Sequence, residues 1–479
     1  MTNLPPPTVV PPADPKNVQG DITIGFAKRL ETAIFFIVDD VDSFRKQLAL
    51  LVPKITTADQ VANDKDSIKK HKQSGGTDLL KISGLNIAFS QSGLTKLGIT
   101  DDLGDAAFKE GQFTDAQNLG DKGSTSGGVF TPDWIPTFRS AVHGIIIIAG
   151  DSQTTIDERV AETTQIIHLA PKNGSCHQVL RLDGAVRPGD QKGHEHFGFL
   201  DGISNPAIEK IDVNPFPGQE TVRQGIILLG RNGDPTTRPA WALDGSFLAF
   251  RYLFQLVPEF NDFLLHNAIP GLTPEEGAEF LGARLFGRWK SGAPLDLAPL
   301  KDDPVLAADP QRNNNFRYNF PEDPQTQDRC PFAAHVRKTN PRFDLEGLNP
   351  PASTEARRIV RRGIPFGPEL SAQEQQQNTT LQGRGLLFRC YQSDITNGFQ
   401  FVQHSWANNT AFPPQKPETP GFDAIIGQAA DPTSRTITGA DPKAQTTALP
   451  LPIEWVVPKG GEYFFSPSIP ALKSTFGKV

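Results

Sequence analysis

Two stretches of this chain, far apart in the sequence, share one pattern: an apolar β-like run that passes directly into an amphipathic helix. The first is ETAIFFIVDDVDSFRKQLALL from Glu31, where apolar residues recur from Val41 at the spacing of a helix face. The second is SFLAFRYLFQLVPEFNDFLL from Ser246, where the same stepping begins at Val257. We therefore expect a strand followed by a helix at both places.

A second pair of similar stretches preserves this order. GIIIIAGDSQTTIDERV from Gly144 and GLLFRCYQSDITNGFQFV from Gly385 each contain a glycine, an apolar strand, a polar turn and a helix. Solenoid repeats recur every ~20 to 50 residues, a far shorter period, so the pattern predicts duplication of one α+β domain. The two halves would join within Arg231–Gly245. Periodicity leaves open whether their sheets are parallel or antiparallel.

The length of 479 residues fits two such domains, since a domain usually holds ~100 to 200 residues. We place an N-terminal domain at residues 17–235 and a C-terminal domain at residues 236–479, after a proline-rich, disordered arm at residues 1–16. The arm lacks the charged-then-apolar profile of a secretory signal, and a trimmed signal leaves the same appearance. The 43 glycines and 42 prolines predict long irregular loops.

Charge and hydropathy argue against two classes of partner. The formal net charge is -7 and no run of Lys and Arg offers a surface to a phosphate backbone, so nucleic acid is not expected. The longest apolar runs fall far short of the ~20 residues that cross a bilayer, so no membrane partner is expected.

The three cysteines, Cys176, Cys330 and Cys390, are too widely spaced to bind a metal as a CxxC motif. We expect them to be buried apolar side chains, and the spacing leaves open whether two of them form a disulfide.

The stretch HEHFGFLDGISNP, from His194 to Pro206, offers metal-ligand side chains at His194, Glu195, His196 and Asp201. Their spacing suits a metal poorly, because ligands on a helix recur three or four residues apart and His-x-His suits only a strand. Asp-Gly and Asn-Pro are both turn dipeptides. Taken alone, the stretch favours a turn over a metal site.

Three further stretches carry reactive side chains. CPFAAHVRKTNPR places His335 among apolar residues, RRIVRRGIPFG carries paired arginines from Arg357, and GFDAIIG begins at Gly421. Taken singly, the first two indicate a packed histidine and a solvated helix end with a basic last turn. Together with the GxxDG motif at residues 198–202, they resemble the dye-decolorizing peroxidase family, most closely its fungal branch, over nearly the whole chain.

This resemblance implies two ferredoxin-like α+β halves with antiparallel sheets, and one haem b per chain held in the C-terminal half. His335 would be the proximal ligand of the haem iron, and Asp423 would accept a hydrogen bond from its other ring nitrogen. The other residues expected around the haem are Asp201 and Arg361 on the peroxide side, Leu386 and Phe388 as walls, and His194 or His196 at a propionate.

The activity implied is that of a haem peroxidase, which uses hydrogen peroxide to oxidise dyes and phenolic or lignin-like compounds through a ferryl intermediate. Asp201 would take a proton from peroxide and return it to the departing oxygen. A free aspartate has a pKa of ~3.9 against ~6.5 for histidine, so activity should peak on the acid side of neutral. Arg361 stays charged at any working pH and would stabilise the negative charge that builds as the O–O bond breaks.

Two other functions fit parts of the pattern. A haem-binding or haem-delivery protein of the same fold would use His335 but would need neither Asp201 nor Arg361. A non-haem protein would hold a metal on His194, His196 and Asp201, which leaves the proximal pair without a role. The presence of both Asp201 and Arg361 favours the peroxidase.

Bulky dyes are too large for such a walled pocket, so their electrons need another route into the protein. The resemblance implies one, because Trp406 aligns with a tryptophan that family members use as a surface radical site. The ordinary alternative for Trp406 is a buried packing residue. Fungal relatives often carry a tyrosine where this chain has Phe366, and the lack of that phenol shifts the electron route to Trp406. Asp344 and Glu346 would bind Mn2+ as a further substrate, although an exposed carboxylate pair is ordinarily just solvated. The resemblance also implies a secreted protein, either a monomer or a homodimer.

Overall fold

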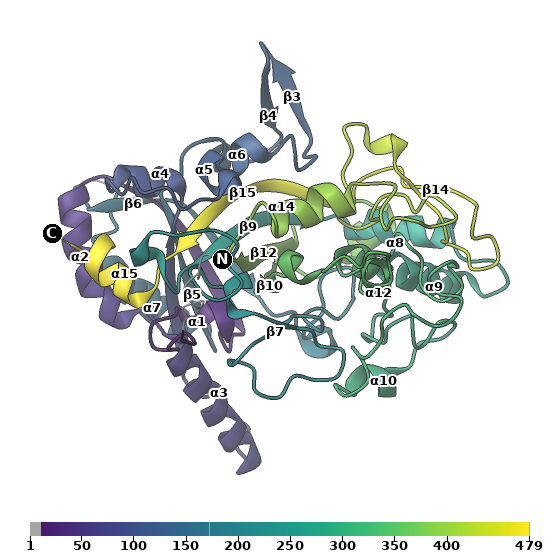
Figure 1. The fold of residues 1–479 in the computed structure, drawn as a ribbon, viewed down its shortest axis with the longest axis horizontal. Coiled ribbons are helices and arrows are strands. Elements are labelled where there is room, and N and C mark those ends of the chain that lie inside the picture. The colour runs from purple at the N-terminus through teal and green to yellow at the C-terminus, as the bar shows by residue number, and fades with distance from the viewer. Residues whose placement is uncertain (1–10, 172, 479) are drawn as a thin grey trace, which may run out of the picture.

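The computed structural model describes residues 11–171 and 173–478, and its main feature is one large sheet (Figure 1). The sheet has nine strands in the order β10-β12-β9-β15-β2-β5-β1-β6, with β11 paired to β12. Every pairing within it is antiparallel. This answers the question that sequence periodicity leaves open.

The first half of the sheet follows the βαββαβ order of a ferredoxin-like domain. Its strands lie side by side as β2-β5-β1-β6, and α2 and α7 are the crossover helices. These elements are β1 (Leu30–Val38), α2 (Val41–Leu51), β2 (Ser83–Phe89), β5 (Gly144–Gly150), α7 (Gln153–Ile166) and β6 (Cys176–Ala185).

The second half repeats this order and confirms the predicted duplication. Strand β9 takes the place of β1, and β12 takes the place of β5, which are the two pairs of similar stretches in the sequence. The elements are β9 (Ser246–Gln255), α8 (Val257–His266), β10 (Val360–Arg361), β11 (Ile364–Phe366), β12 (Gly385–Gln392) and β15 (Val456–Ser466).

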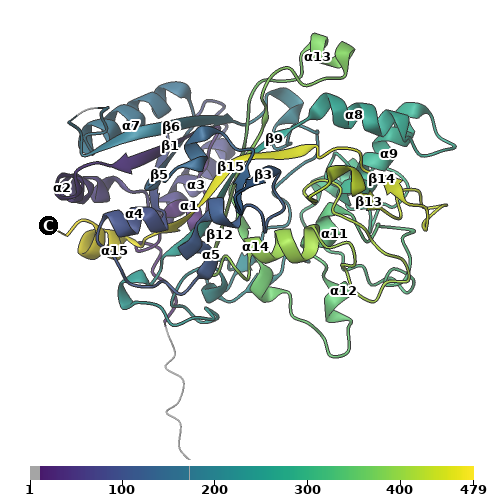
Figure 2. The ribbon, with the colours of Figure 1, turned by 90° about the horizontal axis from the view of Figure 1, so that it is seen from above.

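The two halves are joined at both ends of the sheet. Strand β15 of the second half meets β2 of the first through the pair Phe465 and Phe89, and Figures 1 and 2 show β15 running from one half into the other. At the other end β6 lies against β11, where a Cβ at Gly184 would sit 2.5 Å from Ile364 Cγ2 and 3.0 Å from the Pro365 carbonyl oxygen. The glycine allows this close approach, and the sheet curves toward a barrel.

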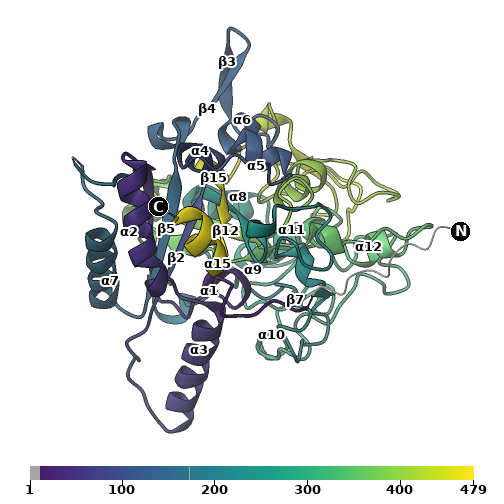
Figure 3. The ribbon, with the colours of Figure 1, turned by 60° about the vertical axis from the view of Figure 1, so that its left-hand side comes forward.

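Side chains that alternate along the strands fill two layers. Phe35 of β1 points inward and meets Phe250 of β9 edge to face at 5.0 Å, so both halves contribute to the core inside the curved sheet. Its neighbour Phe36 points outward and packs on Phe44 of α2. Helices α2 and α7 cover this outer face (Figure 3). Because β1 and β5 are buried on both sides, their sequences are nearly continuous apolar runs.

A third cluster of apolar side chains lies in the second half, around α8 and α9 (Pro274–Phe286). The capping box expected between Thr273 and Glu276 is present, with Pro274 in the first turn. The remaining α-helices and strands are α1 (Gly20–Thr23), α3 (Ala58–Gln73), α4 (Gln91–Lys96), α5 (Ala106–Glu110), α6 (Gln112–Asp115), β3 (Gly123–Ser126), β4 (Val129–Pro132), β7 (Ala207–Ile208), β8 (Thr221–Val222), α10 (Pro304–Ala308), α11 (His335–Thr339), α12 (Phe343–Glu346), α13 (Ala372–Gln377), α14 (Phe399–Phe401), β13 (Thr436–Ile437), β14 (Leu449–Pro450) and α15 (Ile469–Ala471).

The structure corrects two expectations about local order. Residues 1–10 of the predicted arm lie outside the described residues, but residues 11–16 are held against the body: the Ala13 amide donates to Gln224 Oε1 at 2.9 Å, and Arg231 donates to the Pro11 carbonyl. The stretch RRIVRRGIPFG is no helix end either, because it forms β10 and β11 on the edge of the sheet.

Two other expectations concern the thiols and the membrane. Cys176, Cys330 and Cys390 are all buried, as predicted. All three are free thiols, so no disulfide forms among them. Among residues 11–171 and 173–478, no helix combines the length and the apolar character that crossing a bilayer requires.

Candidate active site

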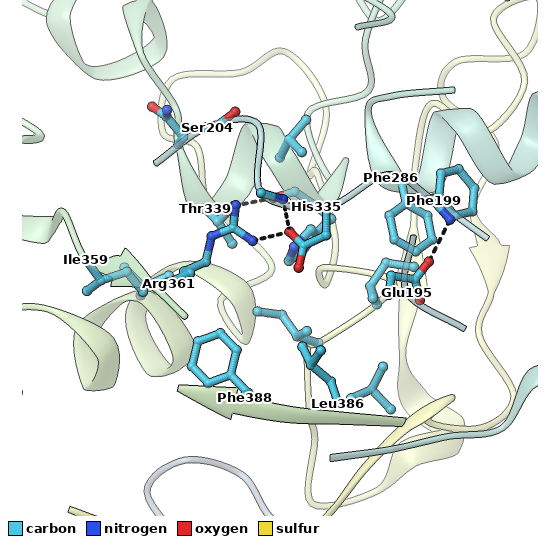
Figure 4. Close-up of a pocket in the computed structure, with 18 of the residues that line it drawn as sticks. Glu195, Phe199, Ser204, Phe286, His335, Thr339, Ile359, Arg361, Leu386 and Phe388 are labelled. Carbon is cyan, nitrogen blue, oxygen red and sulfur yellow. Dashed lines mark hydrogen bonds and ion pairs between the residues drawn. The ribbon is translucent and has the colours of Figure 1, made fainter. Parts of the chain in front are cut away.

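One cavity in the second half brings together residues from distant parts of the chain. Asp201, His335, Arg361, Leu386 and Phe388 all line it. Figure 4 shows Arg361 and His335 on one side of the cavity, with Leu386 and Phe388 facing them from β12. Because the side chains of Leu386 and Phe388 are two residues apart on a strand, they point to the same side.

His335 begins α11 and is oriented by a carboxylate behind it. Its Nδ1 lies 2.8 Å from Asp423 Oδ2, and the other oxygen of Asp423 accepts hydrogen bonds from the amides of Ile425 and Ile426 at 2.8 and 3.0 Å. Burial acts to raise the pKa of Asp423, but His335 and the two amides outweigh it and lower the pKa. An ionised Asp423 keeps the proton on Nδ1 and leaves the Nε2 lone pair free as a metal ligand.

Asp201 and Arg361 form an ion pair on the cavity wall. Arg361 Nη1 lies 2.5 Å from Asp201 Oδ1, and the Gly202 amide donates to the same oxygen at 2.6 Å. Burial acts to raise the pKa of Asp201, but the Arg361 guanidinium and the Gly202 amide outweigh it and lower the pKa. The side chains are 38% and 31% exposed, so a small molecule in the cavity could reach both.

The predicted turn presents Asp201 to the cavity. Gly198 and Gly202 have φ angles of 95° and 85°, in the region that favours glycine. The Asp201 amide donates to the Gly193 carbonyl at 3.0 Å, and the Leu200 amide donates to the Lys290 carbonyl at 3.1 Å. These bonds fix the backbone on both sides of the bend.

Aromatic side chains and arginines complete the lining. Phe199 and Phe286 stack in parallel at 3.7 Å, away from Arg361 (Figure 4). On the rim, Arg288 and Arg342 are buried and donate only to neutral oxygens among the described residues. Burial and the adjacent Arg342 guanidinium lower the pKa of Arg288, so this rim favours an anion.

Comparisons with known proteins match this architecture. The family described as DyP dimeric alpha+beta barrel domain matches residues 17–188, and the family described as Dyp-type peroxidase, C-terminal, matches residues 194–412. The chain belongs to the dye-decolorizing peroxidase family. A dye-decolorizing peroxidase of Auricularia auricula-judae is 45% identical over 464 residues, which are 95% of this chain and 86% of that protein. The chain is therefore a peroxidase of a haem-dependent family.

Solved structures of dye-decolorizing peroxidases have the same fold. A point mutant of the enzyme from Pleurotus ostreatus has 51% sequence identity and a TM-score of 0.94, with 97% of this chain and 100% of that chain covered. A dye-decolorizing peroxidase in complex with 2,6-dimethoxyphenol has 49% identity and a TM-score of 0.86, with 97% and 100% covered. The second family match begins at residue 194, so it includes the GxxDG motif, which the predicted boundary at residue 235 leaves in the N-terminal domain.

The cavity fits the haem that dye-decolorizing peroxidases use. His335 offers one free ring nitrogen, and the walls of Phe199, Phe286, Leu386 and Phe388 are apolar. At the rim, the Nε atoms of Arg342 and Arg358 are buried without a hydrogen-bond partner among the described residues. Such guanidinium groups are suited to carboxylates. Arg358 belongs to the paired arginines of the sequence, but their interpretation as a solvated helix end gave it no role in binding a ligand.

The two histidines of the HEHFGFLDGISNP stretch are not among the described residues that line the cavity, and their expected contact with a haem propionate stays a prediction. His196 Nε2 lies 2.8 Å from the Phe366 carbonyl oxygen, and burial lowers the pKa of His196 to about 4, so the ring is neutral and engaged elsewhere. Glu195, between the two histidines, lines the cavity instead and accepts the amides of Phe197 and Phe199. No group of three metal-ligating side chains that includes His194 occurs in the part of the chain that the structure describes, which contradicts the non-haem alternative.

Trp406 is buried, as its alternative role as a packing residue predicts, and it is not a surface residue. Its side chain is only 3% exposed and stacks in parallel on Phe412 at 5.0 Å, with Phe401 edge-on at 5.7 Å. It lies on a short π-helical turn, Val402–Ala407. Any electron that passes through Trp406 must therefore reach it within a buried aromatic cluster.

The expected Mn2+ site at Asp344 and Glu346 is also contradicted. Asp344 is buried, and its two oxygens accept hydrogen bonds from Arg337 at 2.7 and 2.8 Å and from Lys416 at 2.6 Å. Glu346 is paired with Arg317. Cationic side chains already occupy these carboxylates, so neither is a solvated ligand for a metal.

A buried carboxyl pair near α11 gives a stability prediction. Burial and the adjacent Asp296 carboxyl raise the pKa of Asp323 to about 7. The unfolded side chain has a pKa of ~3.9, so the folded protein holds an extra proton between these values and loses stability as the pH rises through this window. Asp323→Asn should raise the melting temperature by a few degrees at pH 8 and change it little at pH 4.

Thermal unfolding followed by circular dichroism at both pH values checks this prediction. Asp157→Asn on the exposed face of α7 is the control for removal of one carboxylate and should leave the melting temperature unchanged at both. An equal effect of Asp323→Asn at pH 4 and pH 8 would show that the two carboxyl groups do not share a proton.

Proposed function

We propose that this protein uses hydrogen peroxide to oxidise dyes and phenolic or lignin-like compounds. Asp201 and Arg361 would act on the peroxide, and His335 would be the proximal ligand of the haem iron. The observation that carries the proposal is the Asp201–Arg361 ion pair, at 2.5 Å, on the same cavity as the free ring nitrogen of His335. A protein that only binds or delivers haem needs no such pair. The relative solved with 2,6-dimethoxyphenol supports phenols as one substrate class.

Haem b is the cofactor we propose for the cavity. His335 would hold the iron, and the rim arginines Arg288, Arg342 and Arg358 would bind the propionate carboxylates of the haem. When bound, the haem would supply an iron that takes up the oxidising equivalents of peroxide and passes them on as single electrons. Asp423 would strengthen His335 as an electron donor to that iron without contacting it.

Proton transfer is the task of Asp201. Its lowered pKa keeps the carboxylate ionised in weak acid, where it can accept a proton from the peroxide oxygen that approaches the iron. It can then return this proton to the departing oxygen, so that water leaves. Arg361 stabilises the negative charge on the separating oxygens and does not lose its own charge at working pH.

The walls favour small molecules at the reactive centre. Leu386 and Phe388 would admit peroxide and keep bulky dyes out, so the dyes must give up electrons elsewhere. We assign this transfer to Trp406 in its buried aromatic cluster, because Phe366 carries no phenol that could be oxidised.

Trp406→Phe should lower turnover of a bulky dye several-fold and leave the reaction of the holoenzyme with peroxide unchanged. Phenylalanine fills most of the same space but is far harder to oxidise. Stopped-flow and steady-state kinetics measure the two reactions separately. Trp455→Phe, another buried tryptophan outside the cavity lining, is the matched control. Unchanged dye kinetics in Trp406→Phe would remove Trp406 from the electron route.

The absorption spectrum of the purified holoprotein, before and after addition of hydrogen peroxide, tests the whole proposal. A Soret band that shifts with peroxide and returns when a dye or phenol is added supports a peroxidase. A Soret band that peroxide does not change supports the haem-binding alternative, and the absence of a band contradicts both. We also infer secretion from the resemblance to fungal enzymes, which detection of the protein in culture medium would test.

A further inference from the structure

Asn205, near the end of the HEHFGFLDGISNP stretch, makes two hydrogen bonds to the backbone of Arg361. Its Oδ1 accepts the Arg361 amide at 3.0 Å, and its Nδ2 donates to the Arg361 carbonyl at 3.3 Å. Its side chain does not line the cavity. Asn205 therefore contacts the backbone of Arg361 and does not contact the space in which a ligand would lie.

The place of Arg361 in the sheet explains why it needs this partner. Strand β10 is the outermost strand, and the amide of the next residue, Arg362, donates inward to Arg389 of β12 at 2.8 Å. Successive residues of a strand turn their amides to opposite sides, so the Arg361 amide and carbonyl face the outer edge. Asn205 satisfies both groups there, as a neighbouring strand would.

The segment from Asp201 to Asn205 thus holds Arg361 at two points. Asp201 accepts a hydrogen bond from the Arg361 guanidinium at 2.5 Å. This is the only hydrogen bond that the guanidinium makes among the described residues. Asn205 binds the backbone. Asn205 is itself held, since Gln219 Nε2 donates to its carbonyl at 3.2 Å and Pro206 restricts its backbone.

We propose that Asn205 is a positioning residue that keeps Arg361 in the cavity while Asp201 changes its protonation state. This inference rests on the proposed function, in which Asp201 takes up and releases a proton in each turnover. A protonated Asp201 no longer attracts the guanidinium as an ion pair, so at that moment the side-chain contact of Arg361 is weakened. The contact from Asn205 to the backbone does not depend on the proton and holds Arg361 throughout.

The chain contains a matched control for this amide-to-backbone contact. In the first half, Gln19 Oε1 accepts the Ile87 amide at 2.9 Å, and Gln19 Nε2 donates to the Ile87 carbonyl at 2.8 Å. The two bonds are the same in kind, but Ile87 lies on β2, outside the cavity lining. We expect removal of this contact to lower stability and to leave Arg361 in place.

The test compares Asn205→Ala and Gln19→Ala as holoenzymes. In Asn205→Ala we expect the second-order rate constant for the reaction with hydrogen peroxide to fall ~10- to 100-fold, because small displacements of a catalytic group cost this much. The acid limb of its pH profile should move to higher pH, since a displaced Arg361 no longer lowers the pKa of Asp201. Asn205→Asp keeps the acceptor for the Arg361 amide but loses the donor to its carbonyl, so its rate should be intermediate.

Gln19→Ala should melt at a lower temperature but react with peroxide at the wild-type rate per bound haem and with the wild-type pH profile. A crystal structure of Asn205→Ala should show Arg361 displaced from Asp201. Wild-type kinetics and an unmoved Arg361 in Asn205→Ala would overturn the inference, as would an equal loss of rate in Gln19→Ala. If the wild-type holoenzyme fails to react with peroxide, the proposed function is overturned, and the position of Arg361 in the crystal still decides the role of Asn205.

Discussion

Replacing Asp201 with asparagine is expected to slow the reaction of the holoenzyme with hydrogen peroxide by ~10²- to 10⁴-fold, the usual contribution of a general acid and base. Asparagine has nearly the same shape, and its Oδ1 can still accept a hydrogen bond from Arg361, but it cannot take up a proton. Haem content should stay at the wild-type level, because Asp201 is not the iron ligand. Stopped-flow spectroscopy of the Soret band measures the rate.

Asp212→Asn, on the loop after the same motif and outside the cavity lining, controls for the loss of one negative charge. The pH profile gives a second check. Asp201 acts as a base only when ionised, and its pKa is lowered from the ordinary ~3.9, so the wild-type rate should hold as the pH falls into the acid range. A wild-type rate that peaks near pH 8, or an Asp201→Asn variant as fast as the wild type, would show that another group moves the proton.

The elements that the sequence predicts well are those whose own residues carry the full signal. Strand β5 is buried on both faces, so its unbroken apolar run is enough to identify it. Helix α9 has its start signals in Thr273 and Glu276. Strand β10 has neither kind of signal. Its two residues are Val360 and Arg361, and its extended form comes from pairing with β12 and from Asn205, which are contacts between distant parts of the chain.

The same limit applies to the site. Alternation along an extended segment places His194 and His196 on one side and Glu195 on the other, but the sequence does not say which side faces the cavity. Glu195 faces the cavity, whereas His196 makes a hydrogen bond with the carbonyl of Phe366, far along the chain. Asp344 looked solvated because nothing near it in the sequence showed that Lys416 would pair with it. Such contacts depend on the folded arrangement, which a single sequence does not give.

Resemblance to a family supplied what physical reasoning on isolated motifs could not. Asp201, His335 and Arg361 come from three separate loops and strands, and each has an ordinary structural explanation when taken alone. Their convergence on one cavity agrees with the roles that the resemblance implies. The arginine Arg288 was missed because it belongs to no motif, and Arg342, which ends the CPFAAHVRKTNPR stretch, was given no role at the cavity.

Replacing His335 with alanine is expected to abolish haem retention and to lower peroxidase turnover by more than ~10³-fold. The reason is that, among the described residues, His335 is the only histidine on the cavity lining, and alanine in its place offers the iron no nitrogen. Haem content after gel filtration and the Soret absorbance measure the first effect. Added imidazole, which can enter the space left by the ring, should restore part of the Soret band.

Asp423→Asn separates the ligand from the group that orients it. Asparagine can still accept from the amides of Ile425 and Ile426 but carries no charge to hold the Nδ1 proton of His335, so we expect haem to bind and activity to fall ~10- to 100-fold. The iron reduction potential should rise, since an uncharged partner makes His335 a weaker donor. His266→Ala, on the exposed face of α8, is the control for loss of an imidazole. If His335→Ala kept its haem, or if Asp423→Asn left the potential unchanged, the iron would be held by a different side chain, and the presence of Asp201, Arg361 and His335 on one cavity would need another explanation.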